Sequence, residues 1–82
     1  MQNYPNPFNP ATVIGYQVAS PGAVAIDVFD VLGRRVASLV NEWMAPGTYS
    51  VQWNAQSLSS GVYLYRLSAG SVVVTKKLLL QK

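Results

Sequence analysis

The segment Asp30-Val31-Leu32-Gly33-Arg34-Arg35-Val36 is the most informative part of this chain of 82 residues. It is a charged, glycine-centred corner between two runs in which apolar residues alternate along the chain. Glycine supplies the positive φ of a tight reversal, and an aspartate side chain bonds to the backbone two residues further on. Every second residue from Val24 to Val28 shares one face, as does every second residue from Val36 to Val40. A period of two on both sides of a corner predicts paired strands with one buried face.

The same alternation recurs outward from the corner, between turns such as Ser20-Pro21-Gly22 and Ala69-Gly70. The strands that it predicts are Thr12–Val18, Ala23–Asp30, Arg35–Val40, Gly47–Trp53, Val62–Leu67 and Ser71–Leu80. Short runs with turn signals about every ten residues predict an all-β sandwich of about seven antiparallel strands. Gly15, in the middle of the first run, predicts a β-bulge or a close backbone approach. A five-stranded oligonucleotide-binding barrel, which usually carries one helix, is the competing β fold.

The alternation also assigns the core faces of the strands. Inward positions are expected at Ile14, Tyr16, Val18, Val24, Ile26, Val28, Tyr49, Val51, Trp53, Tyr63, Tyr65 and Leu67. The run Val62–Leu67 is expected to be a central strand, buried on both faces. The last run is apolar on both faces through Val72–Val74 and Leu78–Leu80, so it must lie centrally or find a partner edge. We therefore expect some self-association, as a homodimer through edge strands.

The segment after the corner fits two structures. Val36, Leu39, Val40 and Trp43 follow the helical spacing i, i+3, i+4 and i+7. Against a helix stand its short length, its β-branched valines and the following Pro46-Gly47. We therefore expect a strand over Arg35–Val40 and a loop over Asn41–Pro46.

The N-terminal part of the chain differs in composition. Residues 1–11 form a proline-rich segment, and residues 12–82 form the predicted sandwich domain. Prolines lack the N–H donor and push the preceding residue to extended geometry, so Asn3–Pro10 is expected to be stiff and outside the sheets. Phe8 either plugs one end of the sandwich or belongs to a rigid element that a partner groove binds. Met1 directly before this segment suggests a piece of a longer protein.

Composition argues against catalysis. The chain has no histidine and no cysteine, so the usual acid–base group, the thiolate nucleophile and two common metal ligands are missing. The three carboxylates are Asp27, Asp30 and Glu42, and Asp27 and Asp30 lie on opposite faces if their strand runs straight, so they do not form an acid–base pair. We expect no enzyme activity, no cofactor and no metal.

The basic residues do not point to nucleic acid. The formal net charge is +3, and Arg34-Arg35 and Lys76-Lys77 are short pairs rather than a stripe. No apolar run reaches the roughly 18 residues of a membrane span. Lys76 and Lys77 either keep the last strand from pairing with other edges or serve, with the terminal carboxylate, as handles for a receptor.

Taken in order, the segments YPNPFNP (4–10), DVLGRRV (30–36), GVYLYRL (61–67) and KKLLLQK (76–82) resemble the type A C-terminal sorting domain of the bacterial type IX secretion system. The resemblance covers the chain from Tyr4 to Lys82. The pattern is also similar to the immunoglobulin-like domain of the flagellar hook-capping protein, which implies an immunoglobulin-like β-sandwich. It further implies a sorting signal, downstream of an exported cargo in the same natural chain, that directs the cargo across the outer membrane of a Gram-negative bacterium.

Partners, location and recognition residues also follow from the resemblance. The outer-membrane translocon would recognise the domain, and a sortase-like peptidase would remove it and join the cargo to lipopolysaccharide. The protein would pass through the periplasm and end at the cell surface or outside the cell. The resemblance places the recognition motif on Pro5, Pro7, Phe8, Gly33, Arg34, Gly61, Tyr63, Lys76, Lys77 and Lys82.

Two other functions fit a β-sandwich of this composition. A carbohydrate-binding module would use exposed aromatic rings, and Trp43 in the expected loop is the best candidate, because Trp53, Tyr63 and Tyr65 fall on core faces. A structural spacer or self-association domain of a secreted enzyme would use the apolar last strand.

Overall fold

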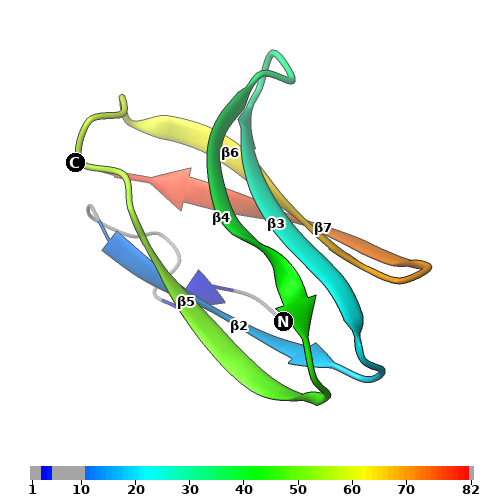
Figure 1. Cartoon of the computed structure of the whole chain (residues 1–82). Coiled ribbons are helices and arrows are strands. Elements are labelled where there is room, and N and C mark those ends of the chain that lie inside the picture. Colours follow the sequence, from blue (N-terminus) through cyan, green and yellow to red (C-terminus); the bar gives the residue numbers. More distant parts are fainter. Residues whose placement is uncertain (1–2, 5–10, 82) are drawn as a thin grey trace.

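The computed structural model describes residues 3–4 and 11–81, the first two as backbone alone. All regular elements of this part of the chain are strands. They are β1 (Asn3–Tyr4), β2 (Ala11–Val18), β3 (Gly22–Asp30), β4 (Arg35–Met44), β5 (Gly47–Asn54), β6 (Gly61–Ala69) and β7 (Val72–Leu80). β1, β2 and β5 form a three-stranded sheet in the order β1-β2-β5, and the other strands form a four-stranded sheet in the order β4-β3-β6-β7. All strand pairs are antiparallel (Figure 1).

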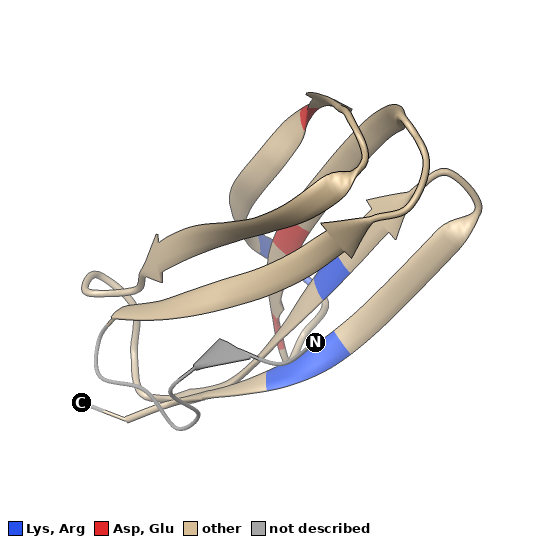
Figure 2. Ribbon diagram, turned by 90° about the horizontal axis from the view of Figure 1, so that it is seen from below, with Lys and Arg blue, Asp and Glu red and all other residues tan. Residues whose placement is uncertain are grey.

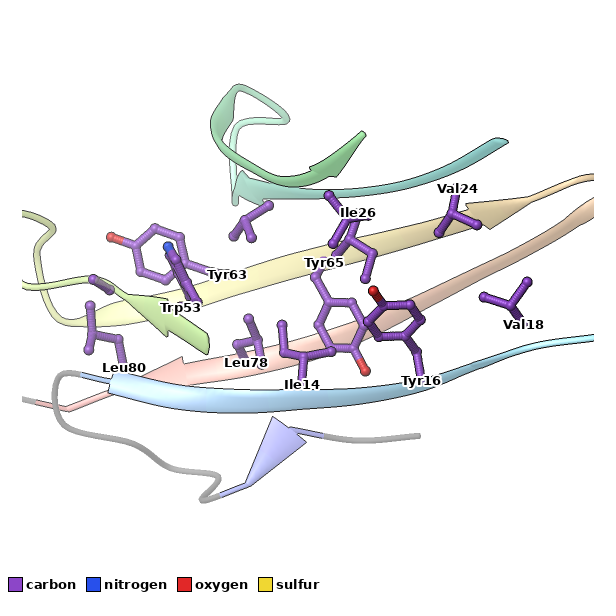
Figure 3. Packing of buried hydrophobic residues seen from close by; sticks show 13 residues of the cluster. Ile14, Tyr16, Val18, Val24, Ile26, Trp53, Tyr63, Tyr65, Leu78 and Leu80 are labelled. Atoms are coloured by element: carbon purple, nitrogen blue, oxygen red, sulfur yellow. The ribbon is translucent and has the colours of Figure 1, made fainter. Parts of the chain in front are cut away.

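The two sheets face each other across one apolar core, which confirms the predicted all-β sandwich. Ile14 and Tyr16 of β2 lie opposite Tyr65 of β6 and Ile26 of β3 (Figure 3). The described residues contain no helix, so they do not have the fold of the five-stranded oligonucleotide-binding barrel with its usual helix. Burial of such large side chains stabilises the fold by roughly 1.5–3 kcal/mol each.

The predicted core faces are largely confirmed. Tyr49, Val51 and Leu67 are partly buried, and the other predicted inward residues are buried. Trp53 packs edge to face against Tyr63, with ring centroids 5.8 Å apart. Leu78 and Leu80 extend the core from the last strand (Figure 3).

The expected loop at Asn41–Pro46 is wrong, because β4 continues to Met44. β3 offers backbone partners as far back as Gly22, which pairs with Met44. The chain then turns at Ala45 and Pro46, where the Tyr49 hydroxyl donates a hydrogen bond of 2.7 Å to the Ala45 carbonyl oxygen.

Irregular pairing explains why this segment also fitted a helix. The register of β3 against β4 shifts between Ile26 and Asp27 and again between Val28 and Phe29, so that Leu39 and Val36 have no partner in β3. These extra residues shift the apolar face of β4 out of strict alternation.

Two further expectations about β2 and its neighbour are wrong. Gly15 does not mark a bulge against β5, because the register of this pair is unbroken and Gly15 faces Ser50, so that only the alternative of a close backbone approach stays a prediction. The segment before β2 does reach a sheet, since Asn3 and Tyr4 pair with Ile14 and Val13. The prolines begin only at Pro5, so these two residues keep the geometry for pairing.

The strands β6 and β7 are exposed on one side. β6 lies centrally between β3 and β7, as predicted, but only its Tyr63 and Tyr65 face is buried, whereas Val62 and Arg66 on the other face are exposed. β7 lies at the edge of its sheet and not in the centre. The four-stranded sheet therefore has an outer face that no described part of the chain covers.

Candidate recognition surface

The corner between β3 and β4 is held by one carboxylate. Asp30 Oδ1 accepts hydrogen bonds from the backbone N–H groups of Leu32, at 2.9 Å, and Arg34, at 3.0 Å. The Asp30 carbonyl oxygen accepts a third bond from the N–H of Gly33, which has a φ of 84°. The predicted roles of Asp30 and Gly33 in the reversal are thus confirmed.

The same carboxylate binds a guanidinium. Arg34 Nε donates to Asp30 Oδ2 at 2.8 Å. The backbone N–H of Arg34 is the main cause that lowers the pKa of Asp30, and it outweighs the partial burial that would raise this pKa. The Arg34 side chain is 73% exposed, so the ion pair fixes geometry more than it adds stability.

Two large apolar side chains project from the tip of this corner. Val31 is 70% exposed and Leu32 is 74% exposed. Beside them, the corner and the Ser59–Tyr63 segment line a shallow groove of about 270 Å³. Adjacent exposed apolar groups at a fixed corner are candidates for contact with other proteins.

Gly61 and Tyr63 shape the other wall of this groove. Gly61 has a φ of 152°, a conformation that essentially only glycine adopts. The Tyr63 ring is buried, and its hydroxyl donates a hydrogen bond of 2.7 Å to the carbonyl oxygen of Ser59. These two residues therefore fix the chain before β6 and present little side-chain surface themselves.

Strand pairing brings the end of β7 to the same place. Leu80 pairs with Gly61, and Leu78 pairs with Tyr63. The structure thus gathers Gly33, Arg34, Gly61 and Tyr63 at one end of the sandwich, which we call the motif end. Pro5, Pro7, Phe8 and Lys82 lie outside the described residues.

The two lysines of the last motif point to opposite sides. Lys77 pairs with Leu64 and is exposed on the outer face of the four-stranded sheet. Lys76 pairs with the buried Tyr65 and is half-buried on the inner side, at the open edge of the sheet. An inward-pointing charge at an edge is one way in which sheets avoid pairing with other chains.

The outer face carries further charges that sequence reasoning did not single out. The Arg66 guanidinium lies over the Phe29 ring, 4.9 Å from its centroid, and Arg35 lies 4.0 Å from Asp27. Figure 2 shows basic bands on the neighbouring strands β6 and β7 of this sheet. Leu32 was missed too, although two bulky apolar residues in a tight turn are a signal of a contact site.

The aromatic side chains of residues 11–81 do not gather into an exposed platform for a glycan. Trp53, Tyr63 and Tyr65 are buried, which confirms their assignment to the core. Trp43, at 66% exposure on β4, is the one aromatic side chain of residues 11–81 that is mainly exposed.

The described residues hold no group of three side chains suited to a metal ion. Within residues 3–4 and 11–81, no helix has the length and apolarity to cross a membrane. The motif end offers a surface for binding, in which the apolar side chains of Val31 and Leu32 lie beside the charged Arg34.

Comparison with known proteins agrees with this picture. Residues 2–81 match the family model described as the secretion system C-terminal sorting domain. No curated protein and no solved structure matches the chain. Because the match spans nearly the whole sequence, the chain belongs to the secretion system C-terminal sorting domain family, the C-terminal sorting signals of cargo for type IX secretion.

Proposed function

We propose that the outer-membrane translocon of the type IX system binds this domain in its folded form, after the cargo has entered the periplasm. The observation that carries the proposal is the motif end, where Val31 and Leu32 project from a corner fixed by Asp30. A rigid apolar protrusion loses little entropy on binding, so it suits recognition by a groove on a partner. A sortase-like attachment protein would act on the same cargo afterwards.

Within the motif end the residues divide by role. Val31, Leu32 and Arg34 would contact the receptor, because their side chains are exposed. Gly33, Gly61 and Tyr63 would shape the surface that these side chains occupy. Recognition stays a prediction for Pro5, Pro7, Phe8 and Lys82. Lys76 would instead keep the edge of the sheet from pairing with other chains.

The domain acts in this proposal by binding and not by catalysis. Asp27 and Asp30, two of the three carboxylates, are engaged by Arg35 and Arg34. The sequence offers no histidine or cysteine to act with them.

Export of a reporter tests the proposal. The chain is fused to the C-terminus of an inert periplasmic protein in a strain with a type IX system, and surface and periplasmic reporter are quantified. We expect surface delivery for the wild-type fusion and retention for the double variant Val31→Asp/Leu32→Asp. The matched control Val13→Asp, at a residue 43% exposed on the other sheet, should be delivered. Intact, folded wild-type fusion that stays in the periplasm contradicts the proposal.

Self-association is a second candidate function, favoured by the exposed edge strand β7. Val72 is 56% exposed and Val73 is 60% exposed, on a strand that has only β6 as a partner strand among the described residues. A homodimer through this edge would bury the two valine side chains and give β7 a second partner strand.

A further inference from the structure

We propose that the outer face of the four-stranded sheet is a second docking surface, for an extended segment of the secretion machinery that carries carboxylates beside an apolar side chain. The inference rests on the proposed function and adds the chemistry of the partner. The charged residues that carry it, Arg35, Arg66 and Lys77, lie outside the motif end, although the groove beside them shares Val31 and Gly33 with it.

Strand pairing builds this face from two rows of side chains. Phe29 pairs with Arg35 on one side and with Leu64 on the other, and Leu64 pairs with Lys77. This first row runs across four strands as cation, apolar, apolar, cation. Cross-strand partners lie on one face of a sheet with neighbouring side chains in contact range.

The second row sets the charge of the face. Arg66 pairs with Asp27 and with Thr75, one step along from the first row, and its guanidinium stacks on Phe29. Arg35 is the nearest basic group to Asp27, at 4.0 Å. The rows together hold three cations and one carboxylate, so the face is positive even after its ion pair is formed.

A groove in this face suits an apolar side chain. It has a volume of about 290 Å³, and Phe29, Leu64 and Arg66 line it together with the corner residues Val31, Gly33 and Asp30. The Asp30 carboxylate is already paired with Arg34 at 2.8 Å. Glu42 does not oppose an acidic ligand there, because it pairs with Val24 near the opposite end of β3. An aliphatic or aromatic side chain would fill the groove, and flanking carboxylates would bind Arg66 and Lys77.

Neighbouring lysines provide a matched test. Lys77→Glu and Lys76→Glu make the same charge change at adjacent positions, but only Lys77 lies on the outer face. In the reporter export assay we expect Arg66→Glu/Lys77→Glu to lower surface delivery by about tenfold, with Lys76→Glu and the charge-conserving Arg66→Lys near wild type. Thermal melting verifies that each variant folds. If a glutamate variant does not fold, Lys77→Gln and Lys76→Gln replace the pair.

Several results would overturn the proposal. An outer-face partner is excluded if Lys76→Glu and Lys77→Glu lower surface delivery equally. It is also excluded if Arg66→Glu/Lys77→Glu is delivered like wild type. In both cases the wild-type fusion still reaches the surface. Binding of the purified chain to phosphatidylglycerol vesicles, lost in the double variant, would assign the face to lipid headgroups. A dimer that the double variant dissociates would assign it to a second copy. Periplasmic retention of the wild-type fusion would contradict the proposed function and this inference together.

Discussion

At the residue scale, the Asp30 carboxylate determines the corner, because it accepts two backbone N–H bonds and one guanidinium bond. The bond to Leu32, two residues on, follows from the preference of aspartate in turns and was predictable from sequence. The hydrogen bond from Arg34 Nε could not be predicted from the sequence, because it depends on how the corner closes.

The lowered pKa of Asp30 makes the corner sensitive to acid. A carboxyl with a folded pKa below its unfolded value of about 3.9 stabilises the fold above that value, and this contribution disappears as pH falls through the folded pKa. We expect Asp30→Asn to lower the free energy of unfolding at about pH 6, and the difference from wild type to shrink at about pH 2.5. Urea denaturation of both proteins at both pH values measures it. A difference that stays constant would show that the charge of Asp30 is irrelevant.

Gly33 tests the geometry of the same corner. A Cβ at Gly33 would meet no atom within 4 Å, so the cost of Gly33→Ala comes from its φ of 84° alone. We expect a loss of about 1–2 kcal/mol in the free energy of unfolding. Gly22→Ala is the control, because it also has free space around the added Cβ and lacks a positive φ. It should be neutral or slightly stabilising, and equal losses at both glycines would exclude backbone strain as the cause.

At the element scale, the six longer strands and most of their ends were predictable, but β1 and the end of β4 were not. Alternating residues located the six longer strands, because period two reports a face directly. β4 exceeded its predicted end at Val40 by running to Met44, since its length is set by its partner β3. The bulges at Val36 and Leu39 depend on the same pairing, which no local pattern contains.

The edge strand β7 tests whether the register is right. Leu78 is fully buried, whereas its neighbour Leu79 lies half-buried on the outer face. We expect Leu78→Ala to lower the free energy of unfolding by about 2–5 kcal/mol through lost burial and a cavity. Leu79→Ala should cost about 1 kcal/mol. Chemical denaturation followed by Trp53 fluorescence compares the two, and a larger loss at Leu79 would mean that β7 is shifted by one residue.

At the scale of the whole molecule, sequence alone could not show which motifs meet. The Asp30–Arg34 corner and the Ser59–Tyr63 segment come together because β3 and β6 are neighbours in the sheet. Likewise, four strands are needed to align Arg35, Phe29, Leu64 and Lys77. The positive φ of Gly33 was predictable from the corner, whereas only the backbone shows that Gly61 also has a positive φ and acts through shape.

The open edge of β7 has a consequence for the molecule in solution. Val72 and Val73 are exposed at the start of a strand that pairs only with β6 in residues 11–81, so two copies can extend their sheets by edge pairing there. We expect concentration-dependent dimers in sedimentation velocity, and a shift toward monomer in Val73→Lys because a charge at the joint must be desolvated. Val13→Lys, exposed on the opposite sheet, should leave the equilibrium unchanged. A strict monomer at high concentration would mean that Lys76 at the edge already prevents pairing. Equal shifts in Val73→Lys and Val13→Lys would mean that the dimer forms through another surface.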